Sequence, residues 1–264
     1  MKIDIAGVNV DPVTKSQALE KIDGLIKSGK PSLVVTTYSE FIVFAYRHPE
    51  YKKVLNSADL SLADGFGILW ASKYLSVAGG FLKLISTLLR ALVDKKYFKT
   101  VIPEVITGSR LIWDIARLAE GRGYSLALVG GGDSVAPQAA YELKKQFPNL
   151  KVNLAVSGAA AFDEKTIMEI ARSNSDILLI AYSPPKQETW LWENLSKLNV
   201  KLAMGLGGTF DYIAGKRLAS PNFMHYMGLE WLWRLITQPW RIRRIWNAVP
   251  VFIWTVFKYK ISKR

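Results

Sequence analysis

Short apolar runs alternate along most of the chain with longer segments in which apolar residues recur at helical spacing. The short runs are rich in Val, Leu and Ile and predict strands, and the longer segments predict amphipathic helices. Because these strands are apolar throughout, they are typical of a parallel sheet that helices cover on both faces. The predicted strands are a run ending at Ala63 together with 32–39, 125–132, 151–158, 176–183 and 200–208.

Helical segments follow these strands and have recognisable ends. Residues 40–55 predict a helix that Pro49 ends or kinks, because proline lacks a backbone N–H and clashes with the preceding turn. The first residues predict a small hairpin. After it, Thr14 and Gln17 predict a capping box for a helix that runs through Ile26. Further helices are expected at 135–147, 163–174 and 186–198.

Two segments break the alternation of strand and helix. Residues 76–102 form an apolar helical insert, which we interpret either as a packed surface helix or as a helix lying on a membrane. After Gly215 the composition shifts to Trp, Arg and other aromatic residues. We therefore expect an α/β protein with a Rossmann-like, mostly parallel sheet at 1–215, and a C-terminal helical, membrane-binding appendage at 216–264.

The positive charge of the chain is concentrated near its C-terminal end. The formal net charge is +13, and residues 231–264 hold eight Lys or Arg residues, no Asp or Glu, and five of the nine tryptophans. Basic and Trp residues mixed with aliphatic ones fit an anionic membrane surface. Nucleic acid also attracts basic patches with aromatics, but it has no need of the aliphatic residues, so no nucleic-acid partner is expected.

The distribution of apolar and basic residues predicts a protein that attaches to a membrane but does not cross it. A helix needs about 20 apolar residues to cross the hydrocarbon core. The strongest candidate, residues 245–257, is shorter and contains Asn247 and Pro250, so it is expected to lie on the surface. The first residues lack the continuous apolar region of a signal peptide. We expect a peripheral protein on the cytoplasmic face of the plasma membrane.

Glycine-rich and polar loops follow several of the predicted strands. In parallel α/β sheets ligands bind beyond the carboxyl ends of the strands. Glycines there let backbone N–H groups approach a phosphate, and helix N-termini favour anions. The loops are TTYSE (36–40), ADGFG (63–67), VGGGD (129–133), YSPPKQE (182–188) and GLGGTFD (205–211), with candidate binding residues Gly130, Gly131, Gly207, Gly208 and Asp211.

Asp64 is the carboxylate of greatest interest in these loops. It either caps the helix that follows, as Asp often does, or takes a proton from a substrate hydroxyl in a crevice above the sheet. Thr36, Lys186 and Gln187 also stand at strand ends, where each has an ordinary structural explanation beside a role in binding sugar or diphosphate oxygens.

Several chemistries lack their usual sequence motifs. The chain has no cysteine, which removes disulfides, zinc–thiolate sites and thiol nucleophiles. It has no HExxH, DxD, GxGxxG or GxxxxGK[ST] motif, so no metal and no resident cofactor is expected. If phosphates bind, arginines must neutralise them, and the tail supplies Arg234, Arg241 and Arg244.

Six motifs together resemble the WecG/TagA/CpsF family of bacterial glycosyltransferases. They are TTYSE, LADGFGILWASK, PEVITGS, YSPPKQE, MGLGGTFDYIAGK and GLEWLWRLITQPWRIRR, and the resemblance extends from Ile3 to about Pro250. It implies the fold called GT-E, with an appendage that docks on the membrane and completes the active site. It also implies inverting, metal-independent transfer from a UDP-sugar to a sugar on undecaprenyl diphosphate, in cell-envelope or exopolysaccharide synthesis.

The resemblance also assigns residues. Asp64 matches the aspartate proposed as the general base, and Thr36 and Gln187 match two other catalytic positions. Asp211 resembles a residue that contacts the nucleotide. The tail arginines Arg234, Arg241 and Arg244 resemble those proposed to hold the nucleotide diphosphate or the lipid phosphates.

The chain departs from the family pattern in three places. Tyr38 stands where an asparagine is common, Val105 replaces a common arginine, and the insert at 76–102 is longer and more apolar than usual. The apolar insert could also serve a contact between subunits of a homo-oligomer. Two other functions stay open from the residues: a non-catalytic membrane-bound scaffold of an envelope complex, and a Rossmann-like enzyme such as a methyltransferase that binds its cofactor at VGGGD.

Overall fold

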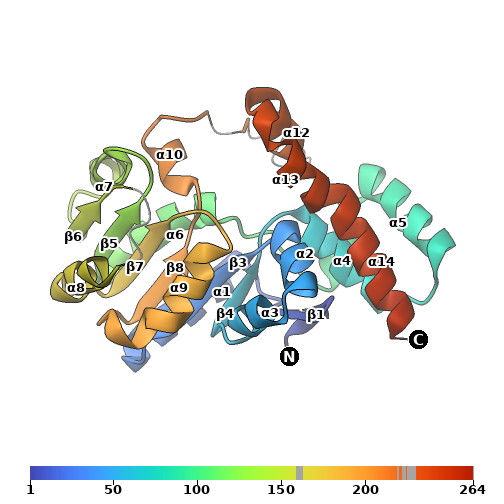
Figure 1. Ribbon diagram of the computed structural model, residues 1–264, viewed down its shortest axis with the longest axis horizontal. Helices are drawn as coiled ribbons and strands as arrows, with labels where there is room; N and C mark the ends of the chain where they lie inside the picture. Colours follow the sequence, from blue (N-terminus) through green and yellow to red (C-terminus); the bar gives the residue numbers. More distant parts are fainter. Residues whose placement is uncertain (159–162, 219, 222–223, 225–229, 264) are drawn as a thin grey trace.

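A six-stranded sheet forms the centre of the molecule (Figure 1). The computed structural model describes residues 1–158, 163–218, 220–221, 224 and 230–263, without the side chains of Glu230, Arg234 and Arg241. The strand order is β4-β3-β8-β7-β5-β6, and all neighbouring strands are parallel, which confirms the predicted α/β class. The strands are β3 (Ser32–Thr37), β4 (Leu60–Ala63), β5 (Ser125–Gly130), β6 (Lys151–Val156), β7 (Ile177–Ala181) and β8 (Leu202–Gly205).

Helices cover both faces of this sheet. Successive side chains of a strand point to opposite faces, so a strand of apolar residues has to be covered on both sides. In β7, Leu178 and Ile180 pack into one hydrophobic cluster and Ile177 and Leu179 pack into the other. The first cluster includes helices α2 (Ser39–Arg47), α3 (Pro49–Asn56), α8 (Glu164–Arg172) and α9 (Lys186–Asn194), the last followed by the short η2 (Leu195–Lys197). The second includes α1 (Lys15–Ser28), α6 (Gly108–Arg122) and α7 (Val135–Gln146).

Several helix boundaries arise from the local signals identified in the sequence. The Thr14 hydroxyl accepts a hydrogen bond from the backbone N–H of Gln17, and the Gln17 side chain accepts one from the backbone N–H of Thr14, which confirms the capping box of α1. Pro49 occupies the first turn of α3, where its missing N–H costs nothing, so α2 ends before it. The start of α2 lies at the carboxyl edge of the sheet because this helix directly follows β3.

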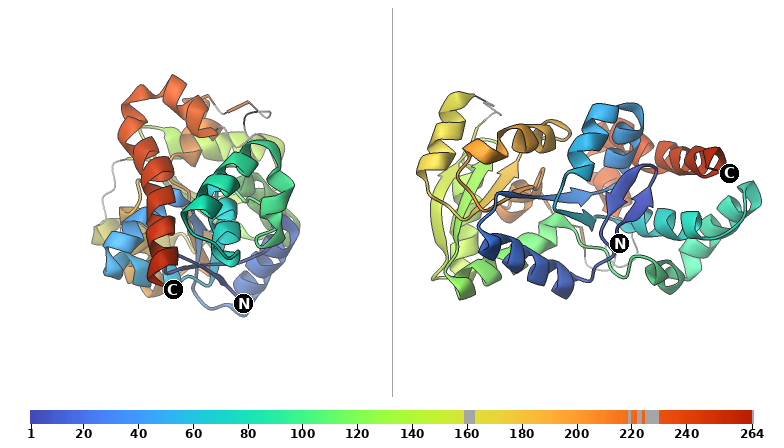
Figure 2. Two further views of the ribbon diagram at one scale, coloured as in Figure 1. Left: turned by 90° about the vertical axis from the view of Figure 1, so that its right-hand side faces the viewer. Right: turned by 90° about the horizontal axis from the view of Figure 1, so that it is seen from below.

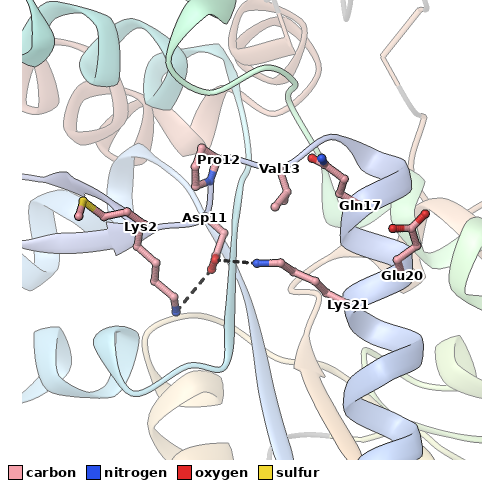
Figure 3. Close-up of a pocket in the computed structure, with 8 residues that line it drawn as sticks. Lys2, Asp11, Pro12, Val13, Gln17, Glu20 and Lys21 are labelled. Carbon is pink, nitrogen blue, oxygen red and sulfur yellow. Dashed lines mark hydrogen bonds and ion pairs between the residues drawn. The ribbon is translucent and has the colours of Figure 1, made fainter.

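The predicted N-terminal hairpin is present as the antiparallel strands β1 (Ile3–Ile5) and β2 (Val8–Val10). The carboxylate of Asp11, directly after it, lies 3.4 Å from the Lys2 ammonium and 3.3 Å from that of Lys21, beside a shallow hollow of about 580 Å³ (Figure 3). Asp11 also accepts a hydrogen bond from the backbone N–H of Ser61 at 2.9 Å. These contacts attach the hairpin to α1 and β4, so the charges of this hollow serve the fold.

The apolar insert and the C-terminal segment lie at the same end of the molecule (Figures 1 and 2). After α4 (Phe66–Ser76), the insert forms α5 (Phe81–Val93) and η1 (Lys95–Thr100). Among the described residues no helix is long and apolar enough to cross a bilayer. The C-terminal segment forms α12 (Glu230–Thr237), η3 (Pro239–Arg241), α13 (Ile242–Trp246), a π-helical turn η4 (Asn247–Val251) at Pro250, and α14 (Phe252–Ser262); α10 (Thr209–Ile213) precedes it.

The last helix, α14, packs into the α/β core. Phe252 and Val256 are buried in the same cluster as the sheet residues of the α2 face. The Lys260 ammonium donates hydrogen bonds to the backbone carbonyls of Tyr74 and, at 2.6 Å, of Val77 at the C-terminal end of α4. The segment after residue 215 is therefore joined to the α/β core through α14.

Replacing Lys260 by methionine is expected to destabilise the protein. Methionine keeps an apolar stem of similar length but leaves the buried carbonyl groups at the end of α4 without their ammonium donor. We expect the free energy of unfolding to fall by about 1–3 kcal/mol in urea denaturation. Lys258→Met is the matched control because Lys258 is exposed on the same helix, and it should change stability by less than about 1 kcal/mol. Equal stability of the two variants would contradict the anchoring role of Lys260.

Candidate active site

One large cavity, of about 1180 Å³, opens at the carboxyl edge of the sheet. Its wall includes residues that directly follow β3, β4, β5, β7 and β8. The structure therefore brings the five glycine-rich and polar loops of the sequence to one place, as parallel strands require. Helices α4, α5, α13 and α14 and the turn η4 complete the wall.

Asp64 stands in this wall, directly after β4. Its backbone N–H donates to the carbonyl of Thr37 at 2.9 Å, and its carboxylate Oδ2 accepts a hydrogen bond from the backbone N–H of Gly108 at 3.2 Å. The N-cap of α4 is Gly65, without a side-chain cap, so Asp64 does not cap the helix that follows it. Its half-buried carboxylate instead lies at the N-terminus of α6, where the helix dipole favours a negative charge.

Thr36 is placed close to Asp64 by the same glycine. A Cβ atom on Gly108 would lie 3.1 Å from Leu206 Cδ2 and 3.6 Å from Thr36 Oγ1, so the absence of a side chain lets α6 approach the strand ends closely. Thr36 is buried and borders the cavity. The sequence candidates Thr36 and Asp64 thus occupy one wall, at the carboxyl ends of the neighbouring strands β3 and β4.

Gln187 holds two of the loops together. Its carboxamide oxygen accepts hydrogen bonds from the backbone N–H groups of Tyr182 and Gly207, each at 3.2 Å. Its amide nitrogen donates to Glu188, and the side chain is only 2 % exposed. Gln187 borders the cavity but is bonded within the protein, which supports a role in positioning the loops after β7 and β8.

Glu188, which the sequence did not single out, is a buried carboxylate beneath these loops. Its two oxygens accept hydrogen bonds from the amide of Gln187 and, at 3.2 Å, from the hydroxyl of Tyr51. Burial raises the pKa of Glu188 to about 7. A Cβ atom on Gly205 would lie only 2.7 Å from Gln187 Nε2, so glycine in β8 makes room for the pair.

This raised pKa predicts a pH-dependent stability. Folded Glu188 keeps its proton where the unfolded chain has lost it, so the free energy of unfolding should fall as pH rises from about 4.5 to about 7. Glu188→Gln is neutral throughout and should be more stable than wild type at pH 8 by about 1–3 kcal/mol, with little difference below pH 4.5. Denaturant unfolding at both pH values measures this. Glu193→Gln, an exposed site on the same helix, should show no such pH-dependent gain; a similar gain there would contradict the assignment to Glu188.

The remaining loop candidates line the cavity with one exception. Gly131, Gly207 and Gly208 border it, whereas Gly130 is not among its lining residues. The exposed Lys186 stands at the first position of α9 and also borders the cavity.

Asp211 in α10 borders the cavity beside an arginine that the sequence reasoning missed. Its carboxylate lies 3.5 Å from the guanidinium of Arg217. Arg217 follows the composition change at Gly215 and belongs to none of the recognised motifs. Its spacing of six residues from Asp211 was therefore the only signal in the sequence that the two could form a pair. The pair places a carboxylate and a guanidinium at the glycine loop after β8, where a ribose and a phosphate could be held.

Arg244 reaches the cavity from the C-terminal segment. Its Nε and Nη2 donate to the carboxylate of Glu40 at 3.1 and 2.8 Å, and Nη2 also donates to the Tyr38 hydroxyl at 2.9 Å. Glu40 keeps the pKa of Arg244 well above its usual range, so the guanidinium is charged. The side chains of Arg234 and Arg241 lie outside the described part of the chain.

The far side of the cavity is apolar, with two lysines at its edge. Lys95 and Lys99 of η1 line the cavity, and partial burial lowers the pKa of Lys95. Val105, at the position of the missing family arginine, also lines it. The apolar wall is formed by Phe66, Leu69 and Trp70 of α4, Leu88 and Ala91 of α5, Ala248 and Val249 of η4, and Phe252 and Ile253 of α14. Within the described residues no group of three or more His, Cys, Asp or Glu is arranged to hold a metal ion.

Comparison with known proteins gives one family and a set of bacterial relatives. A family model described as "Glycosyl transferase WecG/TagA/CpsF family" matches residues 3–95 and 86–264. The N-acetylglucosaminyldiphosphoundecaprenol N-acetyl-beta-D-mannosaminyltransferase of Staphylococcus aureus strain MRSA252 is 25% identical over 261 residues, which cover 98% of this chain and 93% of the relative. The protein of the same description from strain NCTC 8325 / PS 47 gives the same identity and coverage.

Proposed function

The chain belongs to the WecG/TagA/CpsF family of glycosyltransferases, and we propose that it moves N-acetylmannosamine or another hexose from a UDP-sugar to a saccharide on undecaprenyl diphosphate. The acceptor is supported by the Staphylococcus aureus relatives, whose names describe transfer to an N-acetylglucosaminyl diphosphoundecaprenol. Membership in a family of glycosyltransferases favours sugar transfer over a scaffold or a methyltransferase. The product would enter cell-envelope or exopolysaccharide synthesis.

The main observation in support of this proposal is that one cavity has a polar side and an apolar side. At the sheet edge it holds Asp64, the glycine loops and Arg217, which suit a sugar nucleotide. On the other side it is lined by the apolar wall of α4, α5, η4 and α14, which suits an isoprenoid chain. Lys95 and Lys99 lie at that side, where they could meet an acceptor diphosphate.

The proposed reaction is one displacement at the anomeric carbon of the donor. The acceptor hydroxyl loses its proton to the Asp64 carboxylate as its oxygen bonds to that carbon. The bond from the same carbon to the phosphate oxygen breaks, and its electron pair leaves with UDP. Arg217 and Arg244 would stabilise the charge that develops on the leaving diphosphate, so that no metal ion is required. A single displacement inverts the anomeric configuration.

The same proposal locates the protein at the cytoplasmic face of the plasma membrane as a peripheral protein. The basic, Trp-rich segment at 231–264 supports contact with anionic lipid headgroups. An acceptor anchored in the bilayer also requires the cavity to lie near the membrane surface.

A donor panel tests this function. The full-length protein is incubated with UDP-sugars and a short-chain prenyl-diphosphate-linked N-acetylglucosamine, and the product is examined by NMR. We expect release of UDP, a product of inverted anomeric configuration, and full activity in the presence of EDTA. Retained configuration, or no turnover of any UDP-sugar with any lipid-linked acceptor, would contradict the proposal.

A further inference from the structure

The outer face of α5 is apolar and uncovered. Leu82, Leu89, Leu92 and Val93 are between 61% and 86% exposed, whereas Leu84 on the inner face is buried. A helix on the surface of a globular domain ordinarily presents charged or polar residues on its outer side. A contiguous exposed apolar patch of this kind marks a surface that binds something.

Helix α14 extends this patch. The ring of Phe81 in α5 lies 5.9 Å from the ring of Phe257 in α14, which joins the two helices. Trp254 and Ile261 of α14 are each about half exposed. The left view of Figure 2 shows α5 and α14 on one face of the molecule, at the end opposite to α8. We call this surface, made of the outer sides of α5 and α14, the α5–α14 face.

The charges around the α5–α14 face are mostly positive. Lys96 of η1 and Lys258 of α14 are exposed, and Lys263 is exposed as well, with its ammonium paired with Asp4 at 2.7 Å. The only acidic residue between positions 66 and 103 is Asp94, which accepts a hydrogen bond from Arg90 at 2.8 Å, and residues 231–264 contain none. An apolar surface bordered by lysines is complementary to a bilayer with anionic headgroups. A second copy of this chain would place the same positive charges opposite each other.

The two helices that form the α5–α14 face also line the cavity with their other sides. Leu88 and Ala91, on the inner side of α5, line the cavity, and so do Phe252 and Ile253 of α14. The two helices thus separate the cavity from the exposed apolar surface.

We propose that the α5–α14 face docks on an anionic lipid bilayer, with the outer leucines of α5 inserted among the acyl chains. A second part of this proposal rests on the proposed function. In it, the lipid-linked acceptor passes between the two helices into the cavity without leaving the bilayer. Helix α5 then acts as a membrane anchor in addition to the basic C-terminal segment.

Vesicle co-sedimentation of the full-length protein tests the docking. The vesicles are phosphatidylcholine with about one third phosphatidylglycerol. We expect Leu82→Gln/Leu92→Gln to lower the partition coefficient at least about tenfold. The matched control, Tyr141→Gln/Met168→Gln, removes two exposed apolar side chains from α7 and α8 at the other end of the molecule and should bind as wild type does. Wild-type binding that is no stronger than that of the α5 variant would overturn the proposal.

Two further measurements separate the outcomes. A wild-type dimer in the absence of vesicles that becomes a monomer in Leu82→Gln/Leu92→Gln, seen by sedimentation velocity, would identify the face as a subunit interface and overturn the proposal. Transfer to a water-soluble short-chain acceptor should be unchanged in this variant, while transfer to a full-length acceptor in vesicles should fall with binding. If wild type binds vesicles through α5 but transfers no sugar, the docking stands and the proposed function fails.

Discussion

Asp64→Asn is expected to lower kcat by about 10²–10⁴-fold, the usual contribution of a general base. The amide cannot take the proton of the acceptor hydroxyl, although its oxygen can still accept the hydrogen bond that Gly108 gives to the carboxylate. The loops that would hold the nucleotide are unchanged, so UDP binding should stay within about twofold. Initial rates at saturating donor, with UDP affinity from calorimetry, measure both quantities.

The matched control for this change is Asp133→Asn. Asp133 is an exposed aspartate in the loop after β5 and is not among the residues that line the cavity. Its replacement should leave kcat within about twofold. Near-normal turnover by Asp64→Asn would remove Asp64 from the role of base, and an equal loss in both variants would point to a general effect of lost negative charge.

Arg244→Lys is expected to lower kcat/KM by about 100-fold. Lysine keeps the positive charge but not the planar fork that bonds to Glu40 and Tyr38, so the cation would no longer be held at the cavity wall. Loss of one well-placed group that stabilises the transition state has an effect of this order. Steady-state kinetics with the donor varied, together with a pH profile, measures the change.

Two companion variants identify the cause of this loss. Arg243→Lys alters a neighbouring exposed arginine outside the cavity and should leave kcat/KM within about twofold. Glu40→Gln leaves the guanidinium present but holds it more weakly, so an intermediate loss of about tenfold is expected. Full activity of Arg244→Lys would show that the C-terminal segment contributes no charge to the reaction.

Most of the sheet could be predicted from the sequence because five of its strands are buried on both faces. The edge strand β6, with Lys151 and Asn153 exposed, is the exception. Local signals also fixed helix ends: the Thr14–Gln17 capping box and Pro49 each act within a few residues of the boundary that they set. The convergence of the loops followed from parallel topology alone, since all carboxyl ends lie at one edge.

The contacts within the site could not be predicted in the same way. Glu40 and Arg244 are 204 positions apart, and no local pattern records their ion pair. The place of Gln187 after a strand predicts that it borders the cavity, as it does, but its hydrogen bonds to Tyr182, Gly207 and Glu188 depend on how two loops pack and leave no local signal. The insert was recognised as apolar, yet only packing decides which side of α5 is covered.

The contact between the two ends of the described chain links the cavity to the N-terminal hairpin. Asp4 in β1 accepts hydrogen bonds from Tyr259 and Lys263, and the Lys263 contact joins residues 259 positions apart. Closing a loop of this length costs chain entropy, which the docking of α14 on the core must offset. Because α14 carries both this contact and part of the cavity wall, the cavity is complete only while α14 stays docked.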